Sequence, residues 1–293
     1  MILAHTYSIV MRDSRSGGLG VGVQSHFFNV GRVVPWVQAG VGAVATQATA
    51  EPAYGPRGLD LMAEGMSAGE AMEYLLGEDD ARGRRQLGFV DARGGAAAHT
   101  GVNCIEYASH AVGDGWTVQA NIMRDDRVVP AMAEAASSME GDLAARILAV
   151  LAAAERSGGD LRGSQSAAML VALDGPVPAL DLRVEDHPDP IGELHRLVRV
   201  HRAYEHLDAG EEALSSGDRG SAAAAYEAAV SLEGDNPEVL FWQAITMASL
   251  GSMEKAAAVY RRALRMNPDL GELLSRLPET GLVEDGVVEG LEG

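Results

Sequence analysis

The most reactive arrangement that this sequence offers lies near its start, at the hydroxyl group of Thr6. Thr6 opens an alternating run of β-forming residues, 6–12, five positions after Met1. A threonine at the first position of a chain carries an α-amino group, with a pKa of about 7.7–8.0, beside its own hydroxyl. Nucleophile and base then lie in one residue. Thr6 is therefore either an ordinary strand-opening residue or, once residues 1–5 are removed, a candidate catalytic nucleophile.

Asn121 and His26 are the other two candidate catalytic residues. Asn121 ends a strand that we expect to be buried, where its amide can donate to an oxyanion or close the strand by bonding to its turn. His26 ends the run 19–26, which is predicted to pair with 6–12. Direct pairing would place His26 near Thr6 as a base or a substrate contact, although a lone histidine is more often structural.

Five further side chains are candidates for substrate binding. Arg57 and Arg162 are each flanked by turn residues, which suits the binding of a carboxylate, and for Arg162 the alternative is an ion pair with Asp160. The weaker candidates are polar residues in or beside glycine-rich segments, where hydroxyl groups often bond only to the backbone: His99, Thr100 and Ser166.

Metal and nucleotide sites are not expected. His195 and His201 are six residues apart, which misses the helical spacing that places two ligands on one face. The glycine-containing runs are not followed by a helix of phosphate-binding character, and no Walker motif is present. We therefore expect no metal and no cofactor.

Composition narrows the class of protein. The 293 residues carry a formal net charge of −19, which opposes binding to nucleic acid because phosphates would be repelled. The single cysteine excludes an intrachain disulfide and fits a reducing compartment. No apolar run approaches the roughly 18 residues of a membrane span, and no secretion signal opens the chain. A cytoplasmic protein with no membrane contact is expected.

Turn residues and periodicity predict the elements that would position these side chains. The runs 6–12 and 19–26 form a hairpin, and further strand pairs are 85–91 with 95–100 and 165–173 with 180–184. Two pairs of helices lie between the strand groups, at about 59–65, 67–76, 127–137 and 142–155. This order predicts an α+β domain, residues 1–190, with helices on both faces of stacked sheets.

A repeat of 34 residues follows the first domain. Gly217 recurs as Gly251, and three positions coincide at the same interval: Ala222 and Ala256, Tyr226 and Tyr260, Ala229 and Ala263. Residues 203–270 resemble the tetratricopeptide repeat, which implies a concave surface for a protein partner. We predict a helical module over 191–277 and a loose tail over 278–293. Self-association into a homo-oligomer is favoured slightly over another protein partner.

The first domain also resembles a known family. The matching runs are Thr6-Tyr-Ser-Ile-Val, Gly40-Val-Gly-Ala-Val-Ala-Thr-Gln, Tyr54-Gly-Pro-Arg-Gly-Leu, Ala98-His-Thr-Gly, Val118-Gln-Ala-Asn, Gly159-Asp-Leu-Arg-Gly-Ser-Gln-Ser and Asp186-His-Pro-Asp-Pro. Together they resemble the domain-of-unknown-function family 1028 over about residues 4–200. That family looks like an N-terminal-nucleophile (Ntn) hydrolase, which implies a four-layer αββα sandwich and amide hydrolysis by the N-terminal residue.

Two departures from the Ntn pattern bear on Thr6, the matching nucleophile. Five residues precede it, and no lysine lies in the first domain, because Lys255 is the only lysine of the chain. An arginine could supply positive charge there but not a base. The first hypothesis is thus an amidohydrolase that uses Thr6 after proteolysis on a small-molecule substrate. The alternatives are an untrimmed, non-catalytic domain that binds a small ligand or a protein, and an intact chain in which His26 is the base for Thr6.

Overall fold

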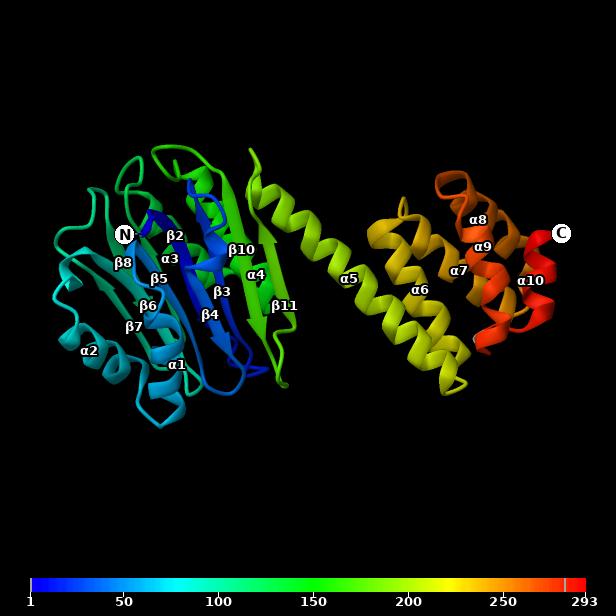
Figure 1. Ribbon diagram of the computed structural model, residues 1–293, viewed down its shortest axis with the longest axis horizontal. Helices are drawn as coiled ribbons and strands as arrows, with labels where there is room; N and C mark the ends of the chain where they lie inside the picture. The colour runs from blue at the N-terminus through cyan, green and yellow to red at the C-terminus, as the bar shows by residue number, and fades with distance from the viewer. Residues whose placement is uncertain (1, 282) are drawn as a thin grey trace. The chain divides into compact units, whose positions relative to one another are not determined.

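A computed structural model describes residues 2–281 and 283–293 of the chain (Figure 1). The chain divides into two units, Met1–His195 and Arg196–Gly293. The boundary predicted from composition lies nearby, at residue 190. One long helix, α5 (Pro190–Ser215), begins in the first unit and continues into the second.

The first unit contains two antiparallel sheets (Figure 1). The first sheet is built around β5, and its strands are β1 (Ile2–Ala4), β4 (Pro35–Gln38), β5 (Gly42–Ala50), β6 (Arg85–Asp91) and β7 (Ala96–Thr100). β6 pairs with one edge of β5, whereas β1 and β4 pair with the two ends of its other edge. β1 was not predicted, because three residues are too few to show an alternating pattern.

The second sheet has the strand order β11-β10-β3-β2-β9-β8. Its strands are β2 (Thr6–Arg12), β3 (Leu19–Ser25), β8 (Ser109–Gly113), β9 (Trp116–Ala120), β10 (Ser166–Ala172) and β11 (Leu180–Val184). The predicted hairpin is confirmed as the central pair β2–β3, in which Thr6 is opposite Ser25. Since β1 belongs to one sheet and β2 to the other, the chain crosses between the sheets at His5.

Two pairs of helices flank the sheets. Their bounds are α1 (Tyr54–Ala63), α2 (Ala68–Glu78), α3 (Val128–Ser138) and α4 (Leu143–Arg156). The predicted capping box of Ser67 and Glu70 starts α2, and Asp142 caps α4 by accepting a hydrogen bond from the N–H of Ala145. α1 begins earlier than predicted, because Pro56 falls in its first turn, where no backbone donor is needed.

Close approach fixes the helices against the sheets. Leu59 and Met62 of α1 pack with Phe89 on the outer face of the first sheet. On the second sheet, a side chain at Gly22 would overlap the methyl group of Ile147 in α4. The gap between the sheets is apolar over much of its length and contains residues such as Val21 and Val90. Polar side chains replace these at the end where β2 begins.

Among its described residues, the second unit contains the later part of α5, five further α-helices and a short 3-10 helix, Pro278–Thr280. The five α-helices are α6 (Arg219–Glu233), α7 (Pro237–Ser249), α8 (Met253–Met266), α9 (Leu270–Arg276) and α10 (Asp285–Glu292). Gly217 and Gly251 occupy equivalent turns, with φ of 81° and 85°, and the repeated alanines and tyrosines are buried. The repeat is therefore structural as well as numerical.

The predicted loose tail is wrong, because residues 285–292 form α10. Val287 and Leu291 lie four positions apart, so they share one face of the helix and are buried in the core of the second unit. The alternation of Gly, Glu and Val concealed this spacing. Over residues 2–281 and 283–293, no helix is both long and apolar enough to cross a membrane.

Candidate functional site

Thr6 lies at the first position of β2, between the two sheets, and has no exposed surface. Its Oγ1 is 2.7 Å from the carbonyl oxygen of Ala4 and 3.1 Å from Oγ of Ser25. Either oxygen can accept the single hydroxyl proton. The residue thus opens its strand, as one reading of the sequence expected, and it also belongs to a buried polar cluster.

The carbonyl group of His5, which precedes Thr6 in the chain, has two donors. Oγ of Ser25 donates to it at 2.6 Å, and Nη2 of Arg162 donates at 2.8 Å. Arg162 is held in place by the buried carboxylate of Asp160, at 3.0 Å from Nε and 2.7 Å from Nη2. The ion pair with Asp160, which the sequence offered as the alternative for Arg162, is therefore present, and its binding of a substrate carboxylate stays a prediction. Two donors on one carbonyl oxygen are the geometry that stabilises an oxyanion.

Asn121 contacts both residues that flank the His5–Thr6 bond. Its backbone N–H donates to the carbonyl oxygen of Thr6 at 3.1 Å, and its Oδ1 lies 2.9 Å from Nδ1 of His5. Its Nδ2 donates to Oε1 of Gln86 at 2.8 Å. The structure therefore places Asn121 beside Thr6, and an oxyanion role for its amide stays a prediction.

A layer of buried glutamines continues the cluster between the sheets. Gln47 donates to Gln86 at 2.7 Å and to the carbonyl oxygen of Thr6 at 3.2 Å. Ser8 donates to Gln47 at 2.6 Å, and Gln119 donates to Ser8 at 2.6 Å. None of these residues was predicted. The signal lay in glutamines within apolar strands, because a buried amide requires hydrogen-bond partners.

The electrostatics of the cluster favour a neutral His5. Burial lowers the pKa of His5, the hydrogen bond with Asn121 partly raises it, the charge of Arg162 lowers it and that of Asp160 raises it. Because the net pKa lies below the usual value for histidine, the ring is uncharged at neutral pH. A neutral ring with its proton on Nδ1 donates to Oδ1 of Asn121.

The other predicted site residues separate into two groups. Thr100 joins the cluster, because its Oγ1 accepts a hydrogen bond from Gln86 at 2.9 Å. Ser166 lies opposite Ser25 on β10, but its hydroxyl donates to the carbonyl oxygen of Phe27 at 2.5 Å. His99 contacts the carbonyl oxygen of Arg82 at 3.0 Å. His26 is exposed, and Ser25, its neighbour in the chain, is the residue that meets Thr6.

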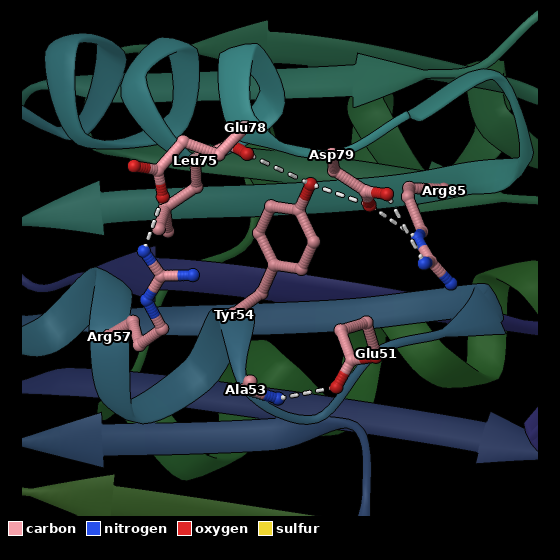
Figure 2. A pocket seen from close by; sticks show the side chains of 8 residues that line it. All are labelled: Glu51, Ala53, Tyr54, Arg57, Leu75, Glu78, Asp79 and Arg85. Carbon is pink, nitrogen blue, oxygen red and sulfur yellow. Dashed lines mark hydrogen bonds and ion pairs between the residues drawn. The ribbon is translucent and has the colours of Figure 1, made fainter. Parts of the chain in front are cut away.

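Arg57 lies elsewhere, beside a cavity of about 230 Å³ between α1 and α2 (Figure 2). An ion pair of 2.5 Å joins it to Glu78 at one end of this cavity. At the other end, Asp79 accepts from Tyr54 at 3.0 Å and from Arg85 at 2.7 Å. This cavity is on the outer face of the first sheet, which separates it from Thr6. The structure therefore does not bring Arg57 to the Thr6 cluster.

No metal centre is evident in the described part of the chain, which contains no group of three or more histidine, cysteine or acidic side chains that could hold an ion.

Two helix-flanked antiparallel sheets with a buried polar cluster, followed by a helical repeat module, define the class of protein. The chain belongs to a family of unknown function, DUF1028, whose sequence profile matches residues 6–194, and residues 207–270 match the tetratricopeptide repeat. Among solved structures, protein SPO2555 from Silicibacter pomeroyi, which carries the DUF1028 family assignment, is similar with 30% sequence identity and a TM-score of 0.62. The similarity covers 67% of this chain and 88% of that chain. No curated protein matches.

Proposed function

We propose that the first unit is an N-terminal-nucleophile amidohydrolase in which Thr6 becomes the nucleophile after residues 1–5 are removed. The observation that carries this proposal is the pair of donors, Ser25 and Arg162, on the carbonyl oxygen next to Thr6. The order of helices, sheet, sheet and helices also suits the four-layer αββα sandwich of such enzymes. A further support is that the match to the family begins at Thr6.

The proposed reaction follows from the groups around Thr6. The freed α-amino group takes the proton of Oγ1 while this oxygen attacks the carbonyl carbon of a small amide. The substrate oxygen gains negative charge, which Ser25 and Arg162 stabilise. The C–N bond then breaks, and the amine leaves with the proton. Water attacks the resulting ester, releases the acid and restores the hydroxyl of Thr6.

The positive charge that a lysine provides in some Ntn enzymes comes from Arg162 in this proposal. Its guanidinium stays protonated and so acts as a donor, not as a base. Because Thr6 has no exposed surface in the intact chain, a substrate reaches it only after the first five residues leave. The exposed position of His26 gives no support to the hypothesis that it serves as the base in an intact chain.

The alternative is a non-catalytic domain that keeps residues 1–5 and binds a small ligand or a protein. Complete burial of Thr6 behind the leading residues favours this second candidate. Mass spectrometry of the protein from its native host distinguishes the two. A mass that lacks residues 1–5 supports the hydrolase, and an intact Met1 supports the binding domain.

Turnover by the trimmed chain provides the second test. A panel of small amides is incubated with the trimmed chain and with its Thr6→Ala and Thr6→Ser variants. Loss of turnover in Thr6→Ala, with activity retained in Thr6→Ser, is the expected result. Equal turnover by all three chains would remove Thr6 from the mechanism.

The tetratricopeptide module has a separate proposed role, in self-association or in docking a protein partner. Its repeats generally mediate protein–protein contacts, and a homo-oligomer in the cytoplasm is the arrangement that we favour.

A further inference from the structure

The residues that precede Thr6 are bound to the first unit as an extended strand. In β1, Ile2, Leu3 and Ala4 pair with Ala50, Thr49 and Ala48 of β5, in antiparallel register. This is the edge of β5 that β4 leaves uncovered, because β4 reaches only residues 42–45. Residues 48–50 therefore form a short free edge, and a strand can be added to it through main-chain hydrogen bonds.

Side chains of this leading segment fit distinct environments. Ala4 has no exposed surface and packs in the apolar core between the sheets, so a larger side chain there would overpack the core. His5 is 8% exposed and hydrogen-bonded to Asn121. Leu3 is 48% exposed. Ala4 thus fills an apolar position and His5 a polar one, while the side chain of Leu3 faces the surface.

The edge of β5 is strained where the segment ends. Ala48 is opposite Ala4 and has a φ of 67°, in the left-handed region that residues other than glycine rarely adopt. It is 1% exposed and pairs on its other side with Arg85. Such conformations persist where the surroundings determine them, and they cluster at ligand-binding sites.

The carbonyl group of His5 gives this strand a defined position relative to the nucleophile. It is the acyl group bonded to the nitrogen of Thr6, and Ser25 and Arg162 hold its oxygen. After cleavage, residues 1–5 would be an acyl product with its new carboxylate at those two donors. A substrate whose acyl part is an extended peptide can reproduce every one of these contacts.

We infer that the substrate class of the site is a linear peptide or peptide amide, bound on its acyl side as a strand on β5 in place of β1. This inference rests on the proposed function. The residue just before the scissile bond takes the place of His5 and hydrogen-bonds to Asn121. The residue before that takes the place of Ala4 and must be small. The leading segment is then a tethered occupant of the peptide site, and it competes with substrate until it dissociates.

The test uses a chain that starts at Thr6, released from a ubiquitin fusion by the fusion's own protease, so that trimming does not depend on the proposed chemistry. The Thr6→Ala form of this chain is titrated with acetyl-Ile-Leu-Ala-His in a calorimeter. Two matched peptides serve as controls: one has Trp in place of Ala, and the other is N-methylated at Leu and Ala. The intact Thr6→Ala chain, which retains residues 1–5, is the protein control.

Binding of the first peptide to the trimmed chain, weakened at least tenfold by either change and lost in the intact chain, is the expected result. Absence of binding at millimolar peptide, or equal binding of all three peptides, overturns the inference. If the trimmed chain shows no cooperative melting, the peptide added in trans must restore it, and failure to do so also overturns the inference.

Turnover distinguishes this inference from the proposed function. The trimmed chain with Thr6 is incubated with the coumarin amide of acetyl-Ile-Leu-Ala-His and with small acyl amides. Peptide binding without cleavage of any amide upholds the peptide site and contradicts the hydrolase. Cleavage of small amides, with the peptide amide neither bound nor cut, upholds the hydrolase and contradicts the peptide site.

Discussion

The hydroxyl group of Ser25 donates a 2.6 Å hydrogen bond to the carbonyl oxygen of His5, twenty positions earlier in the chain. The same hydroxyl accepts the proton of Thr6 Oγ1 at 3.1 Å in one of the two arrangements open to that proton. Ser25 therefore connects the proposed nucleophile with the carbonyl group on which the proposed chemistry acts.

Ser25→Ala in the trimmed chain is expected to lower amide turnover by about 10²–10³-fold, because it removes one oxyanion donor. Thr117→Val is the matched control. Thr117 is also buried, on β9 next to the strand of Thr6, and its hydroxyl has no hydrogen-bond partner among the described residues. Turnover is measured with the amide panel, and circular dichroism checks the folding of both variants. Equal rates for the two variants would separate Ser25 from catalysis.

The leading segment is expected to loosen as the solution becomes acidic. Burial lowers the pKa of His5, so the neutral ring stabilises the folded segment above the unfolded pKa of about 6.5. This stabilisation is lost as the pH falls through the lower, folded pKa. Below about pH 6.5, amide hydrogen exchange in residues 1–11 should therefore become faster. The rates are corrected for intrinsic exchange and compared with those of β10, residues 166–172, as the reference. In the His5→Gln variant, the faster exchange of residues 1–11 at acidic pH should disappear. If it remains, a group other than His5 causes it.

Asp79 is expected to carry part of the acid sensitivity of the first unit. Burial raises the pKa of Asp79, but hydrogen bonds from Arg85, the N–H of Ala81 and Tyr54 outweigh it, so the net pKa is lowered. Its contribution to stability is therefore present above the unfolded pKa of about 3.9 and is lost as the pH falls through the folded value.

Asp79→Asn should cost roughly 1.5–3 kcal/mol at neutral pH, because it leaves the buried guanidinium of Arg85 without its carboxylate. Glu78→Gln, which breaks the exposed ion pair with Arg57, should cost much less, because solvent screens that pair. Urea unfolding at several pH values measures both. The difference in unfolding free energy between Asp79→Asn and the natural chain should shrink below about pH 4. A difference that does not change with pH would contradict the role assigned to Asp79.

Replacing Gly22 is expected to destabilise the first unit as long as Ile147 is present. Gly22→Ala would place a methyl group in overlap with Ile147, and such overpacking typically costs about 1–3 kcal/mol. Ile147→Ala alone should cost about 2–5 kcal/mol through the cavity that it creates. In the double variant the new methyl group enters that cavity, so the combined loss should fall below the sum of the single losses. Urea unfolding of the four chains measures this coupling, and strict additivity would contradict the contact.

Self-association is expected to strengthen with salt. Each copy carries a net charge of −19, so copies repel one another at low ionic strength, and salt screens this repulsion. Light scattering of the full chain should give a mass that exceeds 30.7 kDa and rises with concentration and salt. A chain that ends at residue 195 is the control and should stay monomeric. A full chain of 30.7 kDa under all conditions would contradict the homo-oligomer.

Elements with a local signal were predictable from the sequence. The β2–β3 hairpin has turn residues between two alternating runs, and α2 has its capping box at Ser67 and Glu70. The 34-residue repeat was predictable because identical residues recur at a fixed interval in the sequence. The helix α10 was missed because its stripe consists of only two side chains, Val287 and Leu291.

The candidate site depended on contacts that are distant in sequence. Position alone indicated Thr6 and Asn121, but the bond between His5 and Asn121 spans 116 residues, and the bond between Gln47 and Gln86 spans 39. No single-sequence pattern links such partners. The expected role of His26 failed to gain support for a simpler reason, since residues alternate between the faces of a strand and Ser25 has the inward position.

The crossing at His5 has a consequence for the order of events in the cell. The leading segment pairs with the first sheet through β1, and Thr6, which follows His5, starts a strand of the second sheet. The segment can therefore reach its final position only when both sheets have formed. Under the proposed chemistry, newly made copies would thus stay inert until they are fully assembled. Activation would then be a single irreversible event, because the detached pentapeptide is no longer held at the site by the chain.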